Sequence, residues 1–283
     1  MPTATLHDGA AVDVAVLGDG PAVLLPVGTA VVEGAAAEQA RAWGADPNPG
    51  RTLATALADA GFRIVAADYE GHLAAHPKPL TLTADAVATD LLAVADAAGV
   101  DRFACYGYSW LALAALQLAL RTDRLTGLAM GGFPPLGGPY AAMLEVTRAT
   151  HRMAVAYRQS PPPRREVAPG DWDSVEVTLS PEQTQQYVTL YESLRGFDEA
   201  AALDRVTVPR LAFVGERDDI DYGPRWGGVR VVIAGAVRAH RAELEARGWQ
   251  VAVVPGADHL RAMQPDAVLP VLLPWLRAAT ATS

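Results

Sequence analysis

A serine between an apolar run and a helical pattern is the first residue in the sequence that could do chemistry. The segment 105–110 reads Cys-Tyr-Gly-Tyr-Ser-Trp, and the helical pattern starts directly after Ser109. A serine on so sharp a turn projects its hydroxyl above the sheet, and Gly107 relieves crowding behind it. The pattern is Gly-x-Ser-x-Gly with Leu111 in place of the second glycine. We predict that Ser109 is a nucleophile; the competing interpretation is a serine that only caps the helix.

An acid and a histidine follow the serine in the chain, each just beyond an apolar run that is typical of a strand. They are Asp218 and His259, and the carboxyl ends of parallel strands meet at one edge of a sheet. An imidazole titrates near neutral pH, so His259 can take the proton that makes the Ser109 hydroxyl a nucleophile. Asp218 would fix the imidazole tautomer and stabilise its positive charge. The neighbouring acids are alternatives, Asp219 before Glu216 and Asp221.

The elements that must position these residues alternate between apolar runs and amphipathic segments. This pattern predicts an α/β fold with a mainly parallel, twisted sheet flanked by helices. Strands are expected at 12–17, 22–25, 63–67, 103–106, 127–130, 210–214 and 251–254. Helices are expected from Thr83 to about 98, from 110 to about 121, over 236–247 and from about 265, where Pro270 and Pro274 should kink or shorten the helix.

The alternation is interrupted between residues 133 and 205. Two helical faces occur there, and Ser180-Pro181-Glu182-Gln183 has the residues of a helix start. We expect a helical cap over 133–205, inserted between two parts of a core domain at 1–132 and 206–283. The loop 29–50 is long enough to fold over the site.

With these motifs the chain resembles the α/β-hydrolase superfamily over nearly its full length, from about residue 12 to 276. The segment 68–72 stands where the family usually has an acid–x–Arg–Gly loop, here with Glu70 in place of the arginine. The resemblance implies the fold, the helical cap and a Ser109–His259–Asp218 triad. It does not imply a substrate.

An oxyanion hole is implied by the same resemblance. The amide of Trp110 is one expected donor, because it follows the nucleophile. The second is expected at Val27 or Gly28, in a loop that often begins with His-Gly in the family and here reads Pro-Val-Gly-Thr at 26–29.

Aromatic residues near these segments could line an apolar pocket beneath the cap, although simple packing between cap and core also explains them. Tyr108 and Phe133 are the stronger candidates, because they lie just past strand ends near the serine. The further candidates are Tyr140, Tyr187, Tyr191, Trp110 and Trp172.

Composition argues against several other functions. Asp and Glu number 32 against 23 Lys and Arg, which argues against nucleic-acid binding. No run approaches the roughly 20 apolar residues of a membrane span, and the amino terminus lacks the pattern of a secretory signal. The single cysteine, Cys105, fits a soluble protein of the cytoplasm. His72 and His76 lack a third ligand nearby, so we expect neither a metal nor an organic cofactor.

The sequence therefore favours a serine hydrolase that cleaves a mainly apolar carboxylic ester, thioester or lactone through an acyl-serine intermediate. The partner is a small-molecule substrate, and the sequence gives no oligomeric state. One alternative uses the same triad for acyl transfer, carbon–carbon cleavage or a natural-product biosynthetic step. Another is a non-catalytic small-ligand-binding protein on the same fold.

Overall fold

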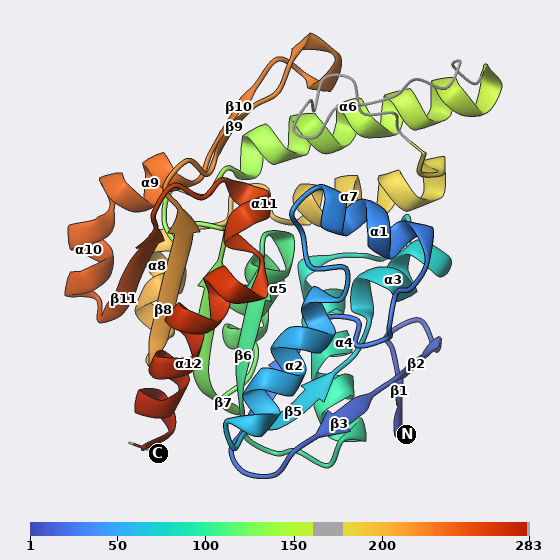
Figure 1. Ribbon diagram of the computed structural model, residues 1–283. Helices are drawn as coiled ribbons and strands as arrows, with labels where there is room; N and C mark the ends of the chain where they lie inside the picture. Colours follow the sequence, from blue (N-terminus) through green and yellow to red (C-terminus); the bar gives the residue numbers. More distant parts are fainter. Residues whose placement is uncertain (161–177, 282–283) are drawn as a thin grey trace.

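A seven-stranded sheet forms the centre of the computed structural model, which describes residues 1–160 and 178–281 (Figure 1). The strand order is β11-β8-β7-β6-β4-β5-β3, and every neighbouring pair is parallel except β3 with β5. The prediction of a mainly parallel sheet flanked by helices is confirmed. The strands are β3 (Ala15–Leu17), β4 (Ala22–Leu25), β5 (Arg63–Ala66), β6 (Phe103–Tyr108), β7 (Leu125–Gly131), β8 (Arg210–Gly215) and β11 (Trp249–Val254).

Apolar helices cover both faces of this sheet. On one face, α2 (Pro49–Asp59) and α12 (Pro265–Ala281) pack their apolar sides against β4, β5 and β8. On the other, α4 (Ala84–Ala97) and α5 (Trp110–Ala119) bury theirs. The Thr83 hydroxyl accepts a hydrogen bond from the Ala86 amide at the start of α4, which is the predicted cap.

Helices from the predicted cap segment lie beyond the carboxyl ends of the strands (Figure 1). They are α6 (Tyr140–Gln159) and α7 (Pro181–Ser193). The third helix of the segment, α8 (Glu199–Arg205), lies beside β8 instead, and Arg205 at its end donates to the Leu120 carbonyl at the end of α5 (Figure 1). The expected helix start at α7 is present as a full capping box between Ser180 and Gln183. The shorter helices α1 (Ala35–Ala42) and α3 (Tyr69–Ala75) follow β4 and β5.

The predicted helix over 236–247 is wrong, because the structure has two helices there. These are α9 (Ala234–Ala239) and α10 (Arg241–Ala246). Between them His240 leaves helical geometry, with φ −101° and ψ 10°, where its ring lies against Gly137.

The expected strand over 12–17 is also divided. β2 (Ala11–Asp13) pairs with β1 (Thr3–Thr5) in a separate ribbon, whereas β3 joins the main sheet. The break falls at Val14, which is fully buried and whose amide donates to the Pro2 carbonyl.

The last helix, α12, is not shortened by its prolines. Pro270 and Pro274 both lie on its exposed side, while Leu272 and Trp275 are buried against the sheet. The carbonyls that lose their amide partners to the two prolines can therefore be hydrated.

A β-hairpin follows the loop after β8. The sequence did not predict it. It consists of β9 (Asp219–Asp221) and β10 (Arg230–Val232), with the short 3₁₀ helix η1 (Pro224–Trp226) between them. The hairpin lies beside α6 (Figure 1). The last element to be placed, α11 (His259–Ala262), follows β11. Within the described ranges, no helix has the length and apolar character needed to cross a bilayer.

Candidate active site

Ser109 occupies a strained turn between β6 and α5. Its φ of 56° makes it the one non-glycine residue with positive φ among those that the structure describes. Such a conformation costs on the order of 1–3 kcal/mol and is held by the surrounding structure. Gly107 permits the turn, since a Cβ there would come within 2.1 Å of the Leu111 carbonyl oxygen. Leu111, which replaces the usual second glycine, is buried in α5 and leaves this turn intact.

Three side chains, from the segments that follow β6, β8 and β11, form a continuous hydrogen-bonded chain at this edge of the sheet. Ser109 Oγ lies 3.1 Å from Nε2 of His259, and Nδ1 of His259 lies 2.7 Å from Oδ1 of Asp218. Asp218 is fully buried, so its carboxylate holds the proton on Nδ1 and leaves Nε2 free to accept the serine proton. This arrangement can activate a hydroxyl for attack on a carbonyl carbon.

The acids that competed with Asp218 in the sequence are engaged elsewhere. Asp219 accepts hydrogen bonds from the amides of Ile233 and Gly235, at 2.8 and 3.0 Å, and so closes the base of the hairpin. The remaining two acids also have other partners: Glu216 accepts from the Gly256 amide at 2.7 Å, and Asp221 lies 3.7 Å from Arg230. Only Asp218 of the four contacts the His259 ring.

The backbone amides expected to form the oxyanion hole differ in their hydrogen bonding. Trp110 is the first residue of α5, and amides of a first helical turn have no acceptor within the helix. The Val27 amide donates to the Leu25 carbonyl at 2.8 Å and is therefore occupied. In the described part of the chain, the Gly28 amide has no such acceptor. Of the two expected positions for the second donor, Gly28 is the better one.

A cavity of about 470 Å³ opens beside the serine and the histidine. Val27, Gly28 and Trp110 contribute to its wall. The loop that the sequence suggested could cover the site also contributes, through Ala30, Val32, Pro47, Asn48, Pro49 and Gly50.

A second, smaller cavity of about 80 Å³ also borders Ser109 and His259. Its side chains are apolar or aromatic and come from the loop after β7, from α6 and α7, and from the β9–β10 hairpin. They are Phe133, Pro139, Met143, Tyr191, Ile220, Tyr222, Val231 and Ile233. Ile220, Tyr222, Val231 and Ile233, which lie in the hairpin or directly after it, were not expected from the sequence, because no periodic pattern marks three-residue strands. Met143 on α6 was likewise not among the expected pocket residues.

Tyr108 has a second role beyond its predicted place in the cavity wall. Its hydroxyl donates to the His259 carbonyl at 2.8 Å, and its ring lies 5.2 Å from the imidazole. Burial, and then the nearby Asp218 carboxylate, raise the pKa of this hydroxyl well above its ordinary value. Tyr108 therefore remains a neutral donor that ties the histidine loop to β6.

The other predicted aromatic residues divide into two groups. Phe133 and Tyr191 line the small cavity. Tyr140 packs between Phe133 and Phe197, and Tyr187 packs edge-on against Trp110 at 5.4 Å, so both support the wall without lining either cavity. Trp172 lies outside the described residues.

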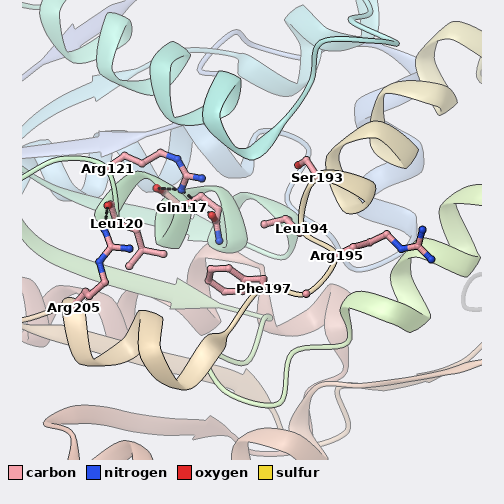
Figure 2. Close-up of a pocket in the computed structure, with 9 residues that line it drawn as sticks. Gln117, Leu120, Arg121, Ser193, Leu194, Arg195, Phe197 and Arg205 are labelled. Carbon is pink, nitrogen blue, oxygen red and sulfur yellow. Dashed lines mark hydrogen bonds between the residues drawn. The ribbon is translucent and has the colours of Figure 1, made fainter.

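Another hollow, of about 430 Å³, lies at the opposite end of α5 (Figure 2). A ten-residue helix is about 15 Å long, so this hollow is remote from Ser109. Its arginines already have partners: Arg121 binds Asp85 and Gln117, Arg205 binds the Leu120 carbonyl, and Arg195 binds Glu192. We assign no ligand to it.

Comparisons with known proteins find similarity in structure but not in sequence. No protein-family model matches the chain, and neither does any curated protein. Among solved structures, an esterase from Thermogutta terrifontis is 20% identical with a TM-score of 0.59, and the alignment covers 98% of this chain and 97% of that one.

Two further structures are similar over their whole length. One, from work on carboxylesterases of Nitrososphaera gargenis, is 15% identical with a TM-score of 0.66 and full coverage of both chains. The other is the enol-lactonase from Burkholderia xenovorans LB400, at 19% identity and a TM-score of 0.61, covering 98% of this chain and all of that one. At these identities the likeness concerns the arrangement of the chain.

Proposed function

We propose that the protein, which has the α/β-hydrolase fold, is a serine hydrolase of carboxylic esters, thioesters or lactones. The observation that carries the proposal is the hydrogen-bonded chain from Ser109 through His259 to Asp218, which opens into a cavity. The structural neighbours named above are esterases and a lactonase, and their reactions agree with this chemistry.

The proposed reaction proceeds through an acyl-serine intermediate. Ser109 Oγ attacks the carbonyl carbon while Nε2 of His259 takes the hydroxyl proton, and the carbonyl oxygen becomes an oxyanion. The amides of Trp110 and Gly28 donate to that oxyanion, and losing one such donor typically costs about 3 kcal/mol in barrier height. The carbon–oxygen or carbon–sulfur bond then breaks, and His259 returns the proton to the leaving group.

Water completes the cycle. His259 removes a proton from a water molecule, which attacks the acyl carbon, and the carbon–Oγ bond breaks as the proton returns to Ser109. A carboxylic acid leaves. Every bond breaks heterolytically and the acyl carbon keeps its oxidation state, so no step needs a redox partner.

Labelling with a fluorophosphonate probe tests the nucleophile. The probe is expected to phosphonylate Ser109, with the adduct located by peptide mass spectrometry, and Ser109→Ala should abolish labelling and ester hydrolysis. Thr81→Ala is a matched control, since Thr81 also contacts a histidine ring and lies outside both cavities. Full hydrolysis by Ser109→Ala would overturn the proposal.

Product analysis with an added alcohol separates hydrolysis from the acyl-transfer alternative. A hydrolase forms mainly the free acid at low alcohol concentration, whereas a transferase forms the new ester. Binding of esters without any acyl-enzyme or product would instead indicate the ligand-binding alternative.

A further inference from the structure

We infer that the substrate has one small apolar group, of about four carbon atoms at most, and one larger group, on the two sides of the reacting carbonyl. This inference rests on the proposed function and specifies the substrate class. It follows from two cavities of different size and character that meet at Ser109 and His259.

The wall of the small cavity consists mainly of apolar and aromatic side chains, several of which are buried. Phe133, Tyr191 and Ile233 are each 3% exposed, and Val231 is 1% exposed. The described residues in its wall include no Asp, Glu, Lys or Arg. A charged or strongly hydrated group placed there would lose its water without gaining a partner, so the cavity selects an apolar group.

Volume sets the size of that group. An engineered apolar cavity of about 150 Å³ holds benzene, which has six carbons. The small cavity measures about 80 Å³, roughly half as much, which corresponds to about three or four carbon atoms. Protein interiors resist overpacking, so a longer group must displace buried side chains.

The larger cavity differs from the small cavity in volume and in the polarity of its wall. It measures about 470 Å³, and its wall includes the side chains of Asp68, Glu70 and Asn48 as well as apolar groups. Trp110 Nε1 donates to Glu70 at 2.8 Å, which holds that carboxylate at the wall. A group several times larger, with polar atoms, can be accommodated there.

The β9–β10 hairpin provides the side chains that limit the small cavity. Ile220 on β9 is paired with Val231 on β10, and both line the cavity. Val232, the next residue, is half-buried and lines neither cavity, as the alternation of side chains along a strand requires. Val231 and Val232 therefore form a matched pair on the same strand.

Two series of esters test the inference, each with one side fixed as a methyl group. Methyl esters of acids from two to eight carbons vary the acyl side, and acetates of alcohols from one to eight carbons vary the other. Acid release is followed by titration at constant pH. We expect kcat/KM to fall by tenfold or more beyond about four carbons in one series only, since a misfit methylene typically changes the rate by roughly 10–200-fold.

Variants of the hairpin test which side chains set the limit on chain length. Val231→Ala should extend the permitted length in that series by one or two carbons, whereas Val232→Ala should leave it unchanged. Ile220→Ala is a second enlargement at the paired position, in case Val231→Ala does not fold. Rates that are independent of length in both series, or that fall equally in both, overturn the inference, as does an equal effect of Val231→Ala and Val232→Ala.

Failure of the inference and failure of the proposed function give different results. If the fluorophosphonate does not label Ser109 and no ester is cleaved, the proposed function fails. If esters are cleaved by labelled enzyme without a length limit, only the two-cavity inference fails. Labelling of Ser109 without cleavage of any member of either series also overturns the inference.

Discussion

In the described part of the protein, two hydrogen-bonded chains of a hydroxyl, an imidazole and a carboxylate have nearly the same distances. In the first, Ser109 Oγ lies 3.1 Å from His259, whose other nitrogen lies 2.7 Å from Asp218. In the second, Thr81 Oγ1 lies 3.1 Å from Nε2 of His7, whose Nδ1 lies 2.9 Å from Asp90. Both carboxylates are fully buried. Hydrogen-bond distances alone do not distinguish a catalytic group from a structural one.

The residues around each hydrogen-bonded chain differ. Asp90 also accepts from the His7 amide at 2.6 Å and from the Tyr69 hydroxyl at 2.7 Å, so it ties the amino-terminal ribbon to α4. Thr81 lies in a surface loop and lines neither of the cavities at the serine. The Ser109 chain instead lies at a strained turn, beside two cavities and the amides that we propose as oxyanion donors. Catalysis requires these additions to the hydrogen-bonded chain.

Replacing the two carboxylates should separate the roles most clearly. Asp218→Asn is expected to lower kcat about 10⁴-fold, because an amide in place of the carboxylate favours the wrong imidazole tautomer. The melting temperature should change little. Steady-state ester hydrolysis and thermal unfolding measure the two effects, and a loss smaller than tenfold would contradict the role of Asp218.

Asp90→Asn should have the opposite effects: a loss of stability with little change in kcat. The neutral side chain weakens a buried, charge-assisted set of hydrogen bonds, so the free energy of unfolding should fall by about 2 kcal/mol. The kcat value of the folded protein should stay within twofold of the original. Urea unfolding at fixed pH measures the change, and a large loss of kcat without loss of stability would assign Asp90 to the reaction.

The tyrosine hydroxyls on the two chains offer a finer comparison. Tyr108→Phe removes the bond to the His259 carbonyl, so we expect kcat to fall about fivefold, corresponding to about 1 kcal/mol, with KM less affected. Tyr69→Phe removes the bond to Asp90 and should lower stability by a similar amount without changing kcat. Equal effects of both variants on kcat would show that Tyr108 acts only through general stability.

Thr81→Ala should have the smallest effect. An exposed hydroxyl with a histidine partner contributes less than about 0.5 kcal/mol to stability, and kcat should be unchanged. The same assays apply. A measurable loss of activity would mean that the second chain communicates with the first.

Much of this arrangement could be predicted from the sequence because its signals are local. The apolar run before Ser109, Gly107 and the helical pattern after it define the elbow within a few residues. Loops after β8 and β11 restricted the acid and the base to a handful of positions. The sequence favoured Asp218, but only the structure separates it from Asp219, Glu216 and Asp221, because all four lie within residues 216–221 and differ in their partners.

Other features depend on contacts between distant residues and could not be read from local patterns. His7 and Asp90 are 83 positions apart, and nothing in either segment indicates their pairing. The strands of the β9–β10 hairpin have three residues each, too short for alternation to be visible. The exposure of Pro270 and Pro274, which allows α12 to continue, is likewise a property of packing.

Asp219 accepts hydrogen bonds from the amides of Ile233 and Gly235, and we call this contact the clamp. The clamp separates Asp218 from the rest of the β9–β10 hairpin. Asp218 precedes the clamp and is held at the histidine, whereas residues 220–232 follow it and contribute Ile220, Tyr222 and Val231 to the small-cavity wall. Insertions at the glycine-rich tip, near Gly227 and Gly228, would therefore alter the size of molecule that is admitted while leaving the acid in place. In a protein of this design, new preferences can evolve through a short stretch of chain without rebuilding the reactive centre.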